Sequence, residues 1–340
     1  MRIGLVGFFG NNNFGDEAIL QAMIGQLKKY HEPIQIVVFT DTPEKTREKY
    51  NVITFSRKQI SHLVAGINYC DIIIFTGGSL FQDETSLLNM FYYYGVAKLC
   101  RLYKKKLIFY SQGFDRLKRR ISRVLLKKSI KMANRVSVRD VQSIMYLKKD
   151  LKISKEIGFV IDTALFLQPY QKDNNYKGYV GVNLMSAEGL PKIIKNLKSF
   201  QSQNNIDFIF IPFNPGDRTV YNQLKKKIDI DILEDKEPSV VMGAIKQMDM
   251  LIGQRYHSLV FSAAGRTPFI YLGNNDKGVG FAEMVKQEII SIGTKDMVKK
   301  ISNVYKDREA RKNVISYWME ELEKASMPEF INNLLIHYIK

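Results

Sequence analysis

Cysteine, histidine and tryptophan are scarce in this 340-residue sequence, which contains two, four and one of them. Cys70 and Cys100 stand in apolar surroundings, without a CxxC spacing or a Cys/His cluster. These absences exclude a disulfide-stabilised scaffold and the common zinc motifs. We therefore expect buried free thiols in a reducing compartment and no metal ion.

Long hydrophobic runs are absent as well. No stretch reaches the ~18 apolar residues that span a bilayer. The apolar run at residues 3–9 is too short for a signal peptide followed by a cleavage site, and it is typical of a first strand. We therefore expect a cytoplasmic protein.

The overall composition is ordinary, with 45% hydrophobic and 25% charged residues, which excludes a collagen-like or largely disordered chain. At ~150 residues per domain, the length predicts two domains, each large enough to bury its own core.

Acidic residues are scarce in one segment. Between Lys98 and Lys155 there are 19 Lys and Arg against three acids, a net charge of +16 in a chain whose total is +17. This segment predicts one basic face. Nucleic acid, an anionic membrane surface or an anionic substrate would each suit it.

Apolar runs of strand length alternate with helical patterns along most of the chain, which predicts parallel sheets with helices on both faces. The turn-rich segment 169–178 is a linker. We predict an α/β protein with two Rossmann-like domains, residues 1–168 and 179–295, facing each other across a cleft. C-terminal helices fill residues 296–340: a long helical tail from 296 to about 324, then a last helix from Pro328. Predicted strands span residues 2–8, 34–39, 52–55, 71–76, 107–112, 136–139, 157–161, 179–184, 208–213, 230–233, 250–253, 269–272 and 289–292, and predicted helices include residues 16–30, 58–68 and 85–104.

The segment GFFGNNNFGDEAIL, residues 7–20, lies where the first strand ends and the first helix begins. Ligands of open α/β sheets bind outside the carboxyl ends of strands. Its glycines permit a tight turn, and the asparagines at 11–13 offer amide groups. Asp16 can cap the helix, and Glu17 lies in its first turn. No lysine follows the last glycine, so a P-loop is disfavoured. The run of asparagines favours a ligand loop over a plain capped turn.

A second segment, FTGGSLFQDETS at residues 75–86, follows a buried strand. Gly77-Gly78 ends that strand, and polar residues follow before the next helix. Exposed backbone N–H groups there would suit an anion or a sugar hydroxyl. A plain Gly-Gly turn is the alternative.

The basic segment contains an amphipathic helical pattern at residues 116–131, RLKRRISRVLLKKSIK. This pattern is typical of a helix that lies on an anionic bilayer surface. It is equally typical of a solvated helix that packs on the sheet of its own domain. We expect no nucleic-acid binding, because neither a helix-turn-helix spacing nor an aromatic single-strand platform is present.

The most specific segment is MLIGQRYHSLVFSAAGRTPFIYLG, residues 250–273. Its strand ends at residue 253, and Arg255 and His257 follow at once, before a helix of small residues. Both are therefore predicted at the carboxyl edge of the second sheet. His257 is the one histidine of four at a strand-to-helix junction beside an arginine, and on spacing alone a functional role and a structural role stay equally open.

Taken in order, GFFGNNNFGDEAIL, GGSLFQDETS, SVRD, DTALF, GQRYHSLVFSAAGRTPFI and NDKGVGFAEMV resemble the polysaccharide pyruvyl transferase family over most of the chain. The resemblance implies a GT-B-like fold. It also implies transfer of the pyruvyl group of phosphoenolpyruvate to two hydroxyls of a sugar, on a cell-surface polysaccharide or its lipid-linked precursor, as a cyclic ketal.

Carried over by position, Arg255 and His257 match the family's donor-site pair, Arg139 and Asp140 its VRD strand end, and Asp162 its D-x-A-F segment. Lys277 falls where members often carry a lysine. Guanidinium forks suit a donor with a phosphate and a carboxylate, so we assign donor binding to Arg255, Arg139 and Lys277. His257 is the expected general acid.

A carboxylate should deprotonate the attacking hydroxyl, and Asp16, Glu17 and Asp83 all remain candidates. We expect phosphoenolpyruvate as donor substrate, a saccharide acceptor, neither cofactor nor nucleotide, and contact of the basic face with anionic lipid at the inner side of the membrane. The predicted acceptor ligands are Asn11, Asn12, Asn13, Gly77, Gly78, Ser79, Gln82 and Asp83.

Two other interpretations stay open. A GT-B glycosyltransferase would bind a sugar nucleotide and not phosphoenolpyruvate. A non-catalytic basic protein that docks on membrane or nucleic acid would not need Arg255 or His257.

Overall fold

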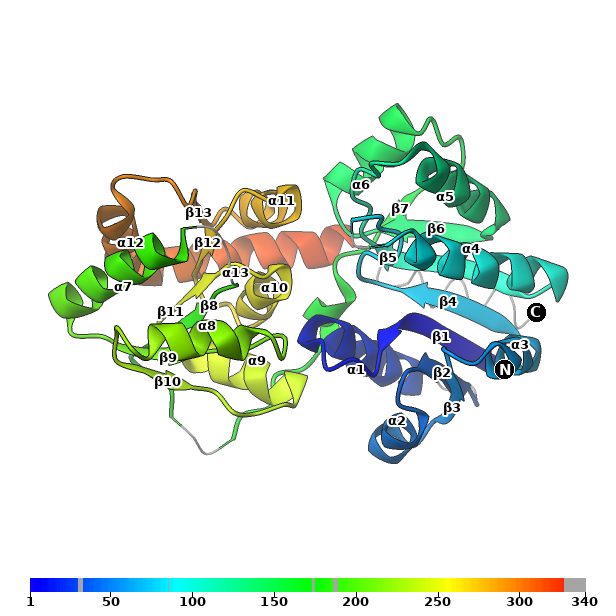
Figure 1. Ribbon diagram of the computed structural model, residues 1–340, viewed down its shortest axis with the longest axis horizontal. Coiled ribbons are helices and arrows are strands. Elements are labelled where there is room, and N and C mark those ends of the chain that lie inside the picture. Colours follow the sequence, from blue (N-terminus) through cyan, green and yellow to red (C-terminus); the bar gives the residue numbers. More distant parts are fainter. Residues whose placement is uncertain (30–32, 85, 173–174, 186–188, 327–340) are drawn as a thin grey trace. The chain divides into compact units, whose positions relative to one another are not determined.

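The computed structural model describes residues 1–29, 33–84, 86–172, 175–185 and 189–326 (Figure 1). These residues form two compact units. The first contains residues 1–12, 16–166 and, at the end of the described chain, 323–326; the second contains residues 13–15 and 167–322.

The first unit is built on a seven-stranded parallel sheet with the order β3-β2-β1-β4-β5-β6-β7. Its central strands are runs of apolar residues buried on both faces, as in the Ile-Ile-Ile-Phe-Thr sequence of β4. The strand order reverses between β1 and β4, and this is the topological switch point of the sheet. The strands are β1 (Arg2–Phe9), β2 (Gln35–Thr40), β3 (Ile53–Ser56), β4 (Ile72–Thr76), β5 (Lys106–Gln112), β6 (Arg135–Val138) and β7 (Gly158–Phe159).

The second unit repeats this design with a six-stranded parallel sheet in the order β10-β9-β8-β11-β12-β13. Here the switch point lies between β8 and β11. The strands are β8 (Tyr179–Asn183), β9 (Asp207–Phe210), β10 (Ile230–Ile232), β11 (Met250–Gly253), β12 (Phe269–Leu272) and β13 (Glu288–Ile290).

Helices connect the strands, as parallel pairing requires. Their apolar faces pack on the sheets, and each unit contains a large hydrophobic cluster. The first unit has α1 (Phe14–Lys28), α2 (Pro43–Tyr50), α3 (Ile60–Tyr69), α4 (Leu87–Leu102), α5 (Arg120–Met132), α6 (Val141–Met145), a π-helix (Tyr146–Asp150) and a 3-10 helix (Thr163–Phe166). The second has α7 (Leu190–Asn204), α8 (Asp217–Leu224), α9 (Pro238–Gln247), α10 (Tyr256–Ala264), α11 (Asp276–Met284), α12 (Met297–Lys306) and α13 (Arg308–Ala325).

The predicted helical tail from residue 296 to about 324 consists of two helices, α12 and α13, separated at Asp307. The Asp307 N–H still bonds to the Asn303 carbonyl, and α13 begins at the next residue in a new direction (Figure 1). The last helix predicted from Pro328 lies outside the described residues.

Both cysteines are buried free thiols, as expected. Burial raises the pKa of Cys70 and of Cys100 to about 12, so neither is a reactive thiolate near neutral pH. In the described part of the chain, no helix is long and apolar enough to cross a membrane.

Candidate functional site

In the first unit, the two loops predicted to bind ligand flank the switch point, because one follows β1 and the other follows β4. Gly78 has a positive φ of 72°, which glycine adopts without strain. A Cβ at Gly78 would lie 3.3 Å from Asp16 Oδ1. The Asp16 carboxylate therefore lies against the backbone of the Gly-Gly turn.

Local hydrogen bonds shape the loop after β1. Glu17 Oε1 accepts from the Gly10 N–H at 2.7 Å, and Asn13 Oδ1 accepts from the Gly15 N–H at 3.1 Å. Gly10 and Asn12 both have positive φ. These bonds give Glu17 and Asn13 a part in holding the loop, and their catalytic and acceptor roles stay predictions.

Asp16 is half-buried in the first turn of α1. Burial, followed by the charge of Glu17, raises the pKa of Asp16 from 3.8 to about 7, against the opposing effects of Arg139 and Arg57. A carboxyl group with that pKa exchanges its proton near neutral pH, which suits a general base.

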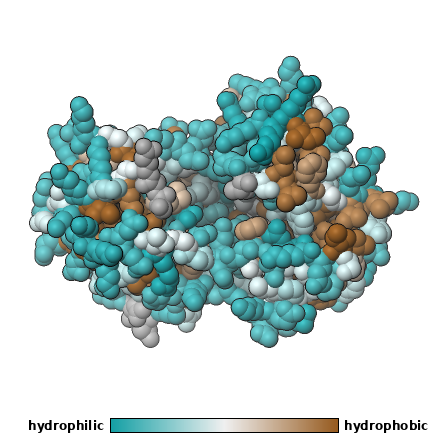
Figure 2. All heavy atoms as spheres, viewed as in Figure 1, coloured by the Kyte–Doolittle hydropathy of each residue, from teal (hydrophilic) through white to brown (hydrophobic). Residues whose placement is uncertain are grey.

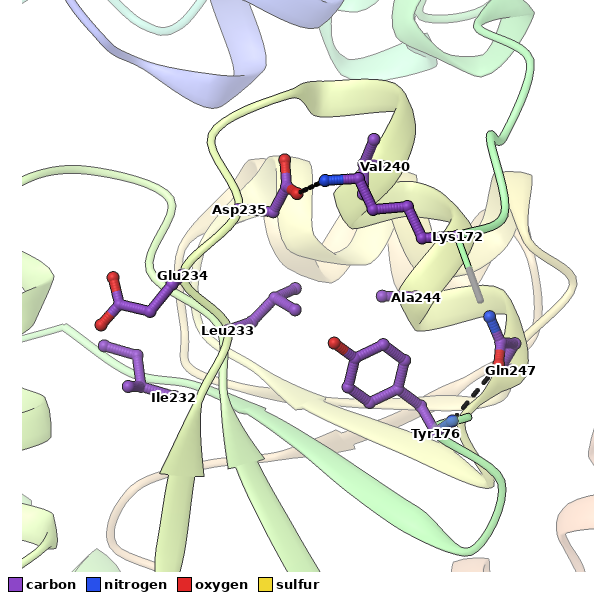
Figure 3. Close-up of a pocket in the computed structure, with 9 residues that line it drawn as sticks. All are labelled: Lys172, Tyr176, Ile232, Leu233, Glu234, Asp235, Val240, Ala244 and Gln247. Atoms are coloured by element: carbon purple, nitrogen blue, oxygen red, sulfur yellow. Dashed lines mark hydrogen bonds and ion pairs between the residues drawn. The ribbon is translucent and has the colours of Figure 1, made fainter. Parts of the chain in front are cut away.

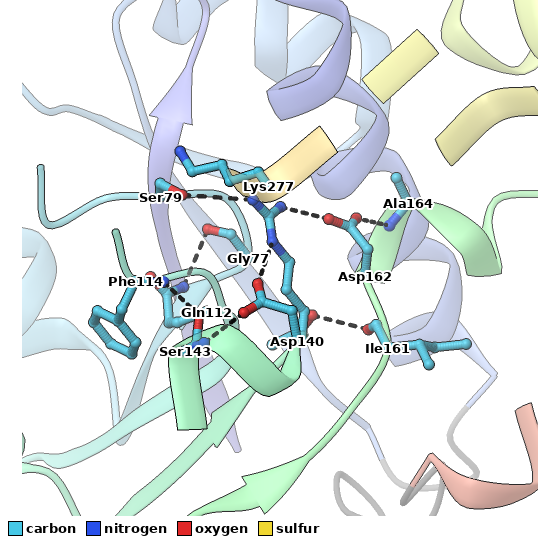
Figure 4. A network of polar contacts seen from close by, with 12 residues as sticks. Gly77, Ser79, Gln112, Phe114, Asp140, Ser143, Ile161, Asp162, Ala164 and Lys277 are labelled. Atoms are coloured by element: carbon cyan, nitrogen blue, oxygen red, sulfur yellow. Dashed lines mark hydrogen bonds and ion pairs between the residues drawn. The ribbon is translucent and has the colours of Figure 1, made fainter. Parts of the chain in front are cut away.

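Arg139 and Asp162 form a buried ion pair at the ends of β6 and β7 (Figure 4). Arg139 Nη1 donates to Asp162 Oδ2 at 2.5 Å, and Nη2 donates to Ser79 Oγ at 3.5 Å. The Arg139 side chain is 2% exposed. A Cβ at Gly113 would approach its guanidinium to 2.8 Å, so this glycine makes room for the arginine. Arg139, predicted to bind the donor, thus ties together the loops after β4, β6 and β7.

The Gly-Gly turn is itself fixed by β5. Gln112 Nε2 donates to the carbonyls of Phe75 and Gly77 at 3.0 and 3.1 Å (Figure 4). The Gly113 N–H donates to the Gly78 carbonyl at 2.8 Å. This bracing holds the predicted acceptor residues Gly77, Gly78 and Ser79 in one conformation.

Asp83 has a structural role. Its two carboxylate oxygens accept from the N–H groups of Lys118 and Arg119 at 3.1 and 2.8 Å, just before α5. Burial acts to raise the pKa of Asp83, but these hydrogen bonds leave it below its ordinary value. The side chain of Gln82 accepts from the Glu84 N–H at 3.0 Å. Their binding of an acceptor stays a prediction.

Sequence reasoning missed a cluster after β2 and β3. The Arg57 guanidinium lies 4.8 Å from the ring centre of Phe8 and 5.1 Å from that of Tyr92, and its Nε is 3.7 Å from Asp41 Oδ1. Phe8 is 39% exposed, at the carboxyl end of β1. Asp41 and Arg57 each follow a predicted strand, and that position was the signal that could have found them.

In the second unit, Arg255 and its partners flank the switch point between β8 and β11. The Arg255 N–H donates to Asn183 Oδ1 at 3.1 Å, and its Nε and Nη2 donate to Asp217 at 2.8 and 2.5 Å. Asp217 also accepts from the N–H groups of Phe213 and Asn214. The Arg255 side chain is 30% exposed while that of Asp217 is 1% exposed. Asp217 thus orients the Arg255 guanidinium through Nε and Nη2.

His257 lies in the first turn of α10, half-buried and in edge contact with Tyr256 at 5.2 Å between ring centres. Lys277 lies in the first turn of α11, after the neighbouring strand β12, and its N–H donates to the capping Asn275 at 3.0 Å. Arg255, His257 and Lys277 therefore follow adjacent strands at one edge of the sheet.

A separate cavity of the second unit has a volume of about 390 Å³ and lies between α9 and the end of β10 (Figure 3). Lys172 pairs with Asp235 across it, and Tyr176 bonds to Gln247. It contains none of the predicted site residues. Among the described residues there is also no group of three or more His, Cys, Asp or Glu placed to hold a metal ion.

The family model described as polysaccharide pyruvyl transferase matches residues 13–276, which include the loop after β1, Arg139, Asp162 and the Arg255–His257 segment. A search of curated proteins finds no match.

Solved structures are similar in fold at low sequence identity. The putative UDP-N-acetylglucosamine 2-epimerase of Listeria monocytogenes is 12% identical, covers 92% of this chain and 89% of its own, and has a TM-score of 0.65. The S. aureus MnaA–UDP co-structure is 12% identical, with coverage of 99% and 96% and a TM-score of 0.68. For Acinetobacter baumannii MurG the identity is 9%, the coverage 98% and 97%, and the TM-score 0.54. These likenesses confirm the predicted GT-B fold class.

Proposed function

Because the chain belongs to the polysaccharide pyruvyl transferase family, we propose that it transfers the pyruvyl group of phosphoenolpyruvate to two hydroxyls of one saccharide unit. The product is a cyclic ketal, and inorganic phosphate leaves. The acceptor is a cell-surface polysaccharide or its lipid-linked precursor.

The observation that carries this proposal is the pairing of Arg255 with Asp217. A partly exposed guanidinium, fixed through two of its nitrogens at a switch point, suits a small ligand with a phosphate and a carboxylate. Lys277, at the end of the adjacent strand, adds a second cation for the donor.

The chemistry needs one acid and one base. His257 would protonate C3 of the donor, and C2 would then accept the oxygen of the first sugar hydroxyl. Asp16 would take the proton of that hydroxyl, since its pKa of about 7 permits both protonation states. The second hydroxyl would attack the same carbon and give its proton to the departing phosphate, which takes the bridging oxygen and the electrons of the broken C2–O bond, and the ring would close. Atoms balance, and no oxidant or reductant is consumed.

The position of His257 has a consequence for its protonation. A helix N-terminus disfavours the imidazolium form, whereas a bound anionic donor favours it. We expect the pKa of His257 to rise when phosphoenolpyruvate binds, as followed by NMR titration. No rise would argue against His257 as the acid.

The direct test is incubation of the purified chain with phosphoenolpyruvate and candidate glycans, followed by mass spectrometry and a phosphate assay. We expect a gain of one pyruvyl ketal per acceptor unit and one equivalent of phosphate. R255A should abolish both, while K226A, at an exposed lysine after α8, should leave both unchanged.

Thermal shift separates this proposal from a sugar-nucleotide glycosyltransferase. A ligand at 100 times its Kd adds ~2.7 kcal/mol to the free energy of unfolding. Stabilisation by phosphoenolpyruvate, and not by a panel of sugar nucleotides, supports the pyruvyl transferase. The reverse pattern would replace it with the glycosyltransferase.

A further inference from the structure

The basic segment between Lys98 and Lys155 has no part in the chemistry proposed above, apart from Arg139. In the structure it supplies the C-terminal part of α4, all of α5 and α6, and the connections between them. The inner face of α5 is apolar and packs in the core. All its charged residues are basic: Arg120, Arg123, Lys127, Lys128 and Lys131.

Large apolar side chains are exposed on α4, α5 and α6, as pairs three or four residues apart that share a helix face. Figure 2 shows hydrophobic side chains gathered over this part of the first unit. α4 packs against α5, and the segment leading into α5 is hydrogen-bonded to Ser143 of α6 and to Tyr146. The exposed pairs are Leu88 (77%) and Phe91 (49%) on α4, Ile121 (44%) and Val124 (39%) on α5, and Val141 (57%) and Met145 (44%) on α6.

A cavity of about 430 Å³ opens beside the C-terminal half of α5. Its apolar lining is Ile130, Leu151 and Ile153, and no acidic side chain lines it. Lys155 is anchored there by a hydrogen bond to the Ala133 carbonyl. A cavity lined by lysines and by apolar side chains suits a phosphate attached to an apolar group. The four lysines that line it are Lys127, Lys131, Lys152 and Lys155.

Acidic residues are few around the cavity, and none is among its lining residues. Asp150 lies 3.4 Å from Arg116, and Asp140 accepts from the Ser143 N–H at 2.6 Å while its other oxygen is 3.8 Å from Arg139. Each of these two carboxylates thus has a partner outside the cavity lining.

We propose that this surface docks onto an anionic lipid bilayer, with the lysine cavity receiving a headgroup phosphate. The surface consists of the six exposed apolar side chains of α4, α5 and α6, the five basic residues of α5 and the lysine cavity. Its cations attract anionic lipid through an interaction that salt screens, and its apolar side chains enter the interface through one that salt does not screen. This inference does not rest on pyruvyl transfer.

Vesicle co-sedimentation tests the proposal. We expect binding to phosphatidylcholine vesicles that contain phosphatidylglycerol, weak binding to pure phosphatidylcholine, and a decrease with rising salt. K127E/K131E removes two near-surface cations, each of which strengthens binding about fivefold, and adds two repelled carboxylates, so binding should weaken by at least about thirtyfold. K226E/K227E, the matched control in the second unit, makes the same change of charge at exposed lysines and should have little effect. I121S/V124S should weaken the binding that persists at high salt.

Three results would overturn the proposal: vesicle binding that ignores anionic lipid, equal losses in the two charge-reversal pairs, or no vesicle binding by the unaltered protein. If the unaltered protein does not bind vesicles, its binding of inorganic pyrophosphate and of a single-stranded oligonucleotide is measured instead. Pyrophosphate binding that is lost in K127E/K131E would assign the cavity to a soluble phosphate. Oligonucleotide binding that is lost in K127E/K131E would assign it to nucleic acid. If a variant fails to fold, the dependence of vesicle binding on salt and on anionic lipid in the unaltered protein still tests the proposal.

Discussion

Replacing Asp16 by asparagine removes a charge while keeping the size of the side chain. The structure predicts opposite effects on stability and on activity. In the folded protein the pKa of Asp16 is raised to about 7 by burial and by Glu17, whereas its ordinary value is 3.8. The folded chain therefore keeps this proton over a pH range in which the unfolded chain has lost it.

The sign and size of the effect follow from linkage. The contribution of Asp16 to stability is fully present below pH 3.8 and is lost as the pH rises towards 7, because there the folded state binds more protons than the unfolded state. A pKa raised from 3.8 to about 7 corresponds to about 4 kcal/mol. This figure is a ceiling, because the carboxyl group is half-buried and water screens part of the interaction.

Urea unfolding of the wild type and of D16N, followed by circular dichroism between pH 5 and 8, measures this effect. D16N should be the more stable protein at pH 8, and the difference should shrink as the pH falls, while pyruvyl transfer is lost. E17Q removes the charge that, after burial, contributes most to raising the pKa of Asp16. The fall in unfolding free energy with rising pH should therefore occur at lower pH in E17Q than in the wild type. Equal stability of wild type and D16N at pH 8, or a difference that does not vary with pH, would refute the reasoning.

Three further substitutions test other parts of the site. R139M should lower the free energy of unfolding by about 3–5 kcal/mol, because it leaves Asp162 buried without its guanidinium, and R139M/D162N should recover part of that loss in the same urea assay. D217A should be less destabilising than R139M, because the Arg255 side chain that it leaves unpaired is 30% exposed, and it should weaken phosphoenolpyruvate binding in calorimetry; full donor affinity in D217A would remove Asp217 as the residue that orients Arg255. D83N should be less stable than the wild type at pH 7, and the deficit should disappear as the pH falls below the ordinary carboxyl pKa, since the native pKa of Asp83 is low; a deficit constant with pH would contradict this.

The fold was readable from the sequence because its strands are short apolar runs between turn formers. All thirteen predicted strands are present in the structure, with ends that differ by at most three residues. The break between α12 and α13 at Asp307 was not predicted, because neither glycine nor proline marks it. Helix periodicity shows which face is buried but not where the axis changes direction.

The candidate site was only half readable. Loops after β1, β4 and β11 could be found because glycine, asparagine and an Arg/His pair follow apolar runs. Their partners could not, because pairing depends on which strand ends are neighbours. Asp162 meets Arg139 because β7 lies beside β6, and Asp217 meets Arg255 through a strand order that sequence spacing does not encode.

Hydrogen-bond partners separate the three carboxylates that the sequence left open as the base. Asp83 accepts from two backbone N–H groups, and Glu17 accepts from a third. The backbone hydrogen bonds to Asp83 hold its pKa below the ordinary value, and that of Glu17 holds its loop, whereas Asp16 has a pKa of about 7. A base must be ionised to accept a proton, so kcat/KM for transfer should rise with pH through about 7. In E17Q that rise should occur at lower pH, and a profile unchanged by E17Q would assign the base to another residue.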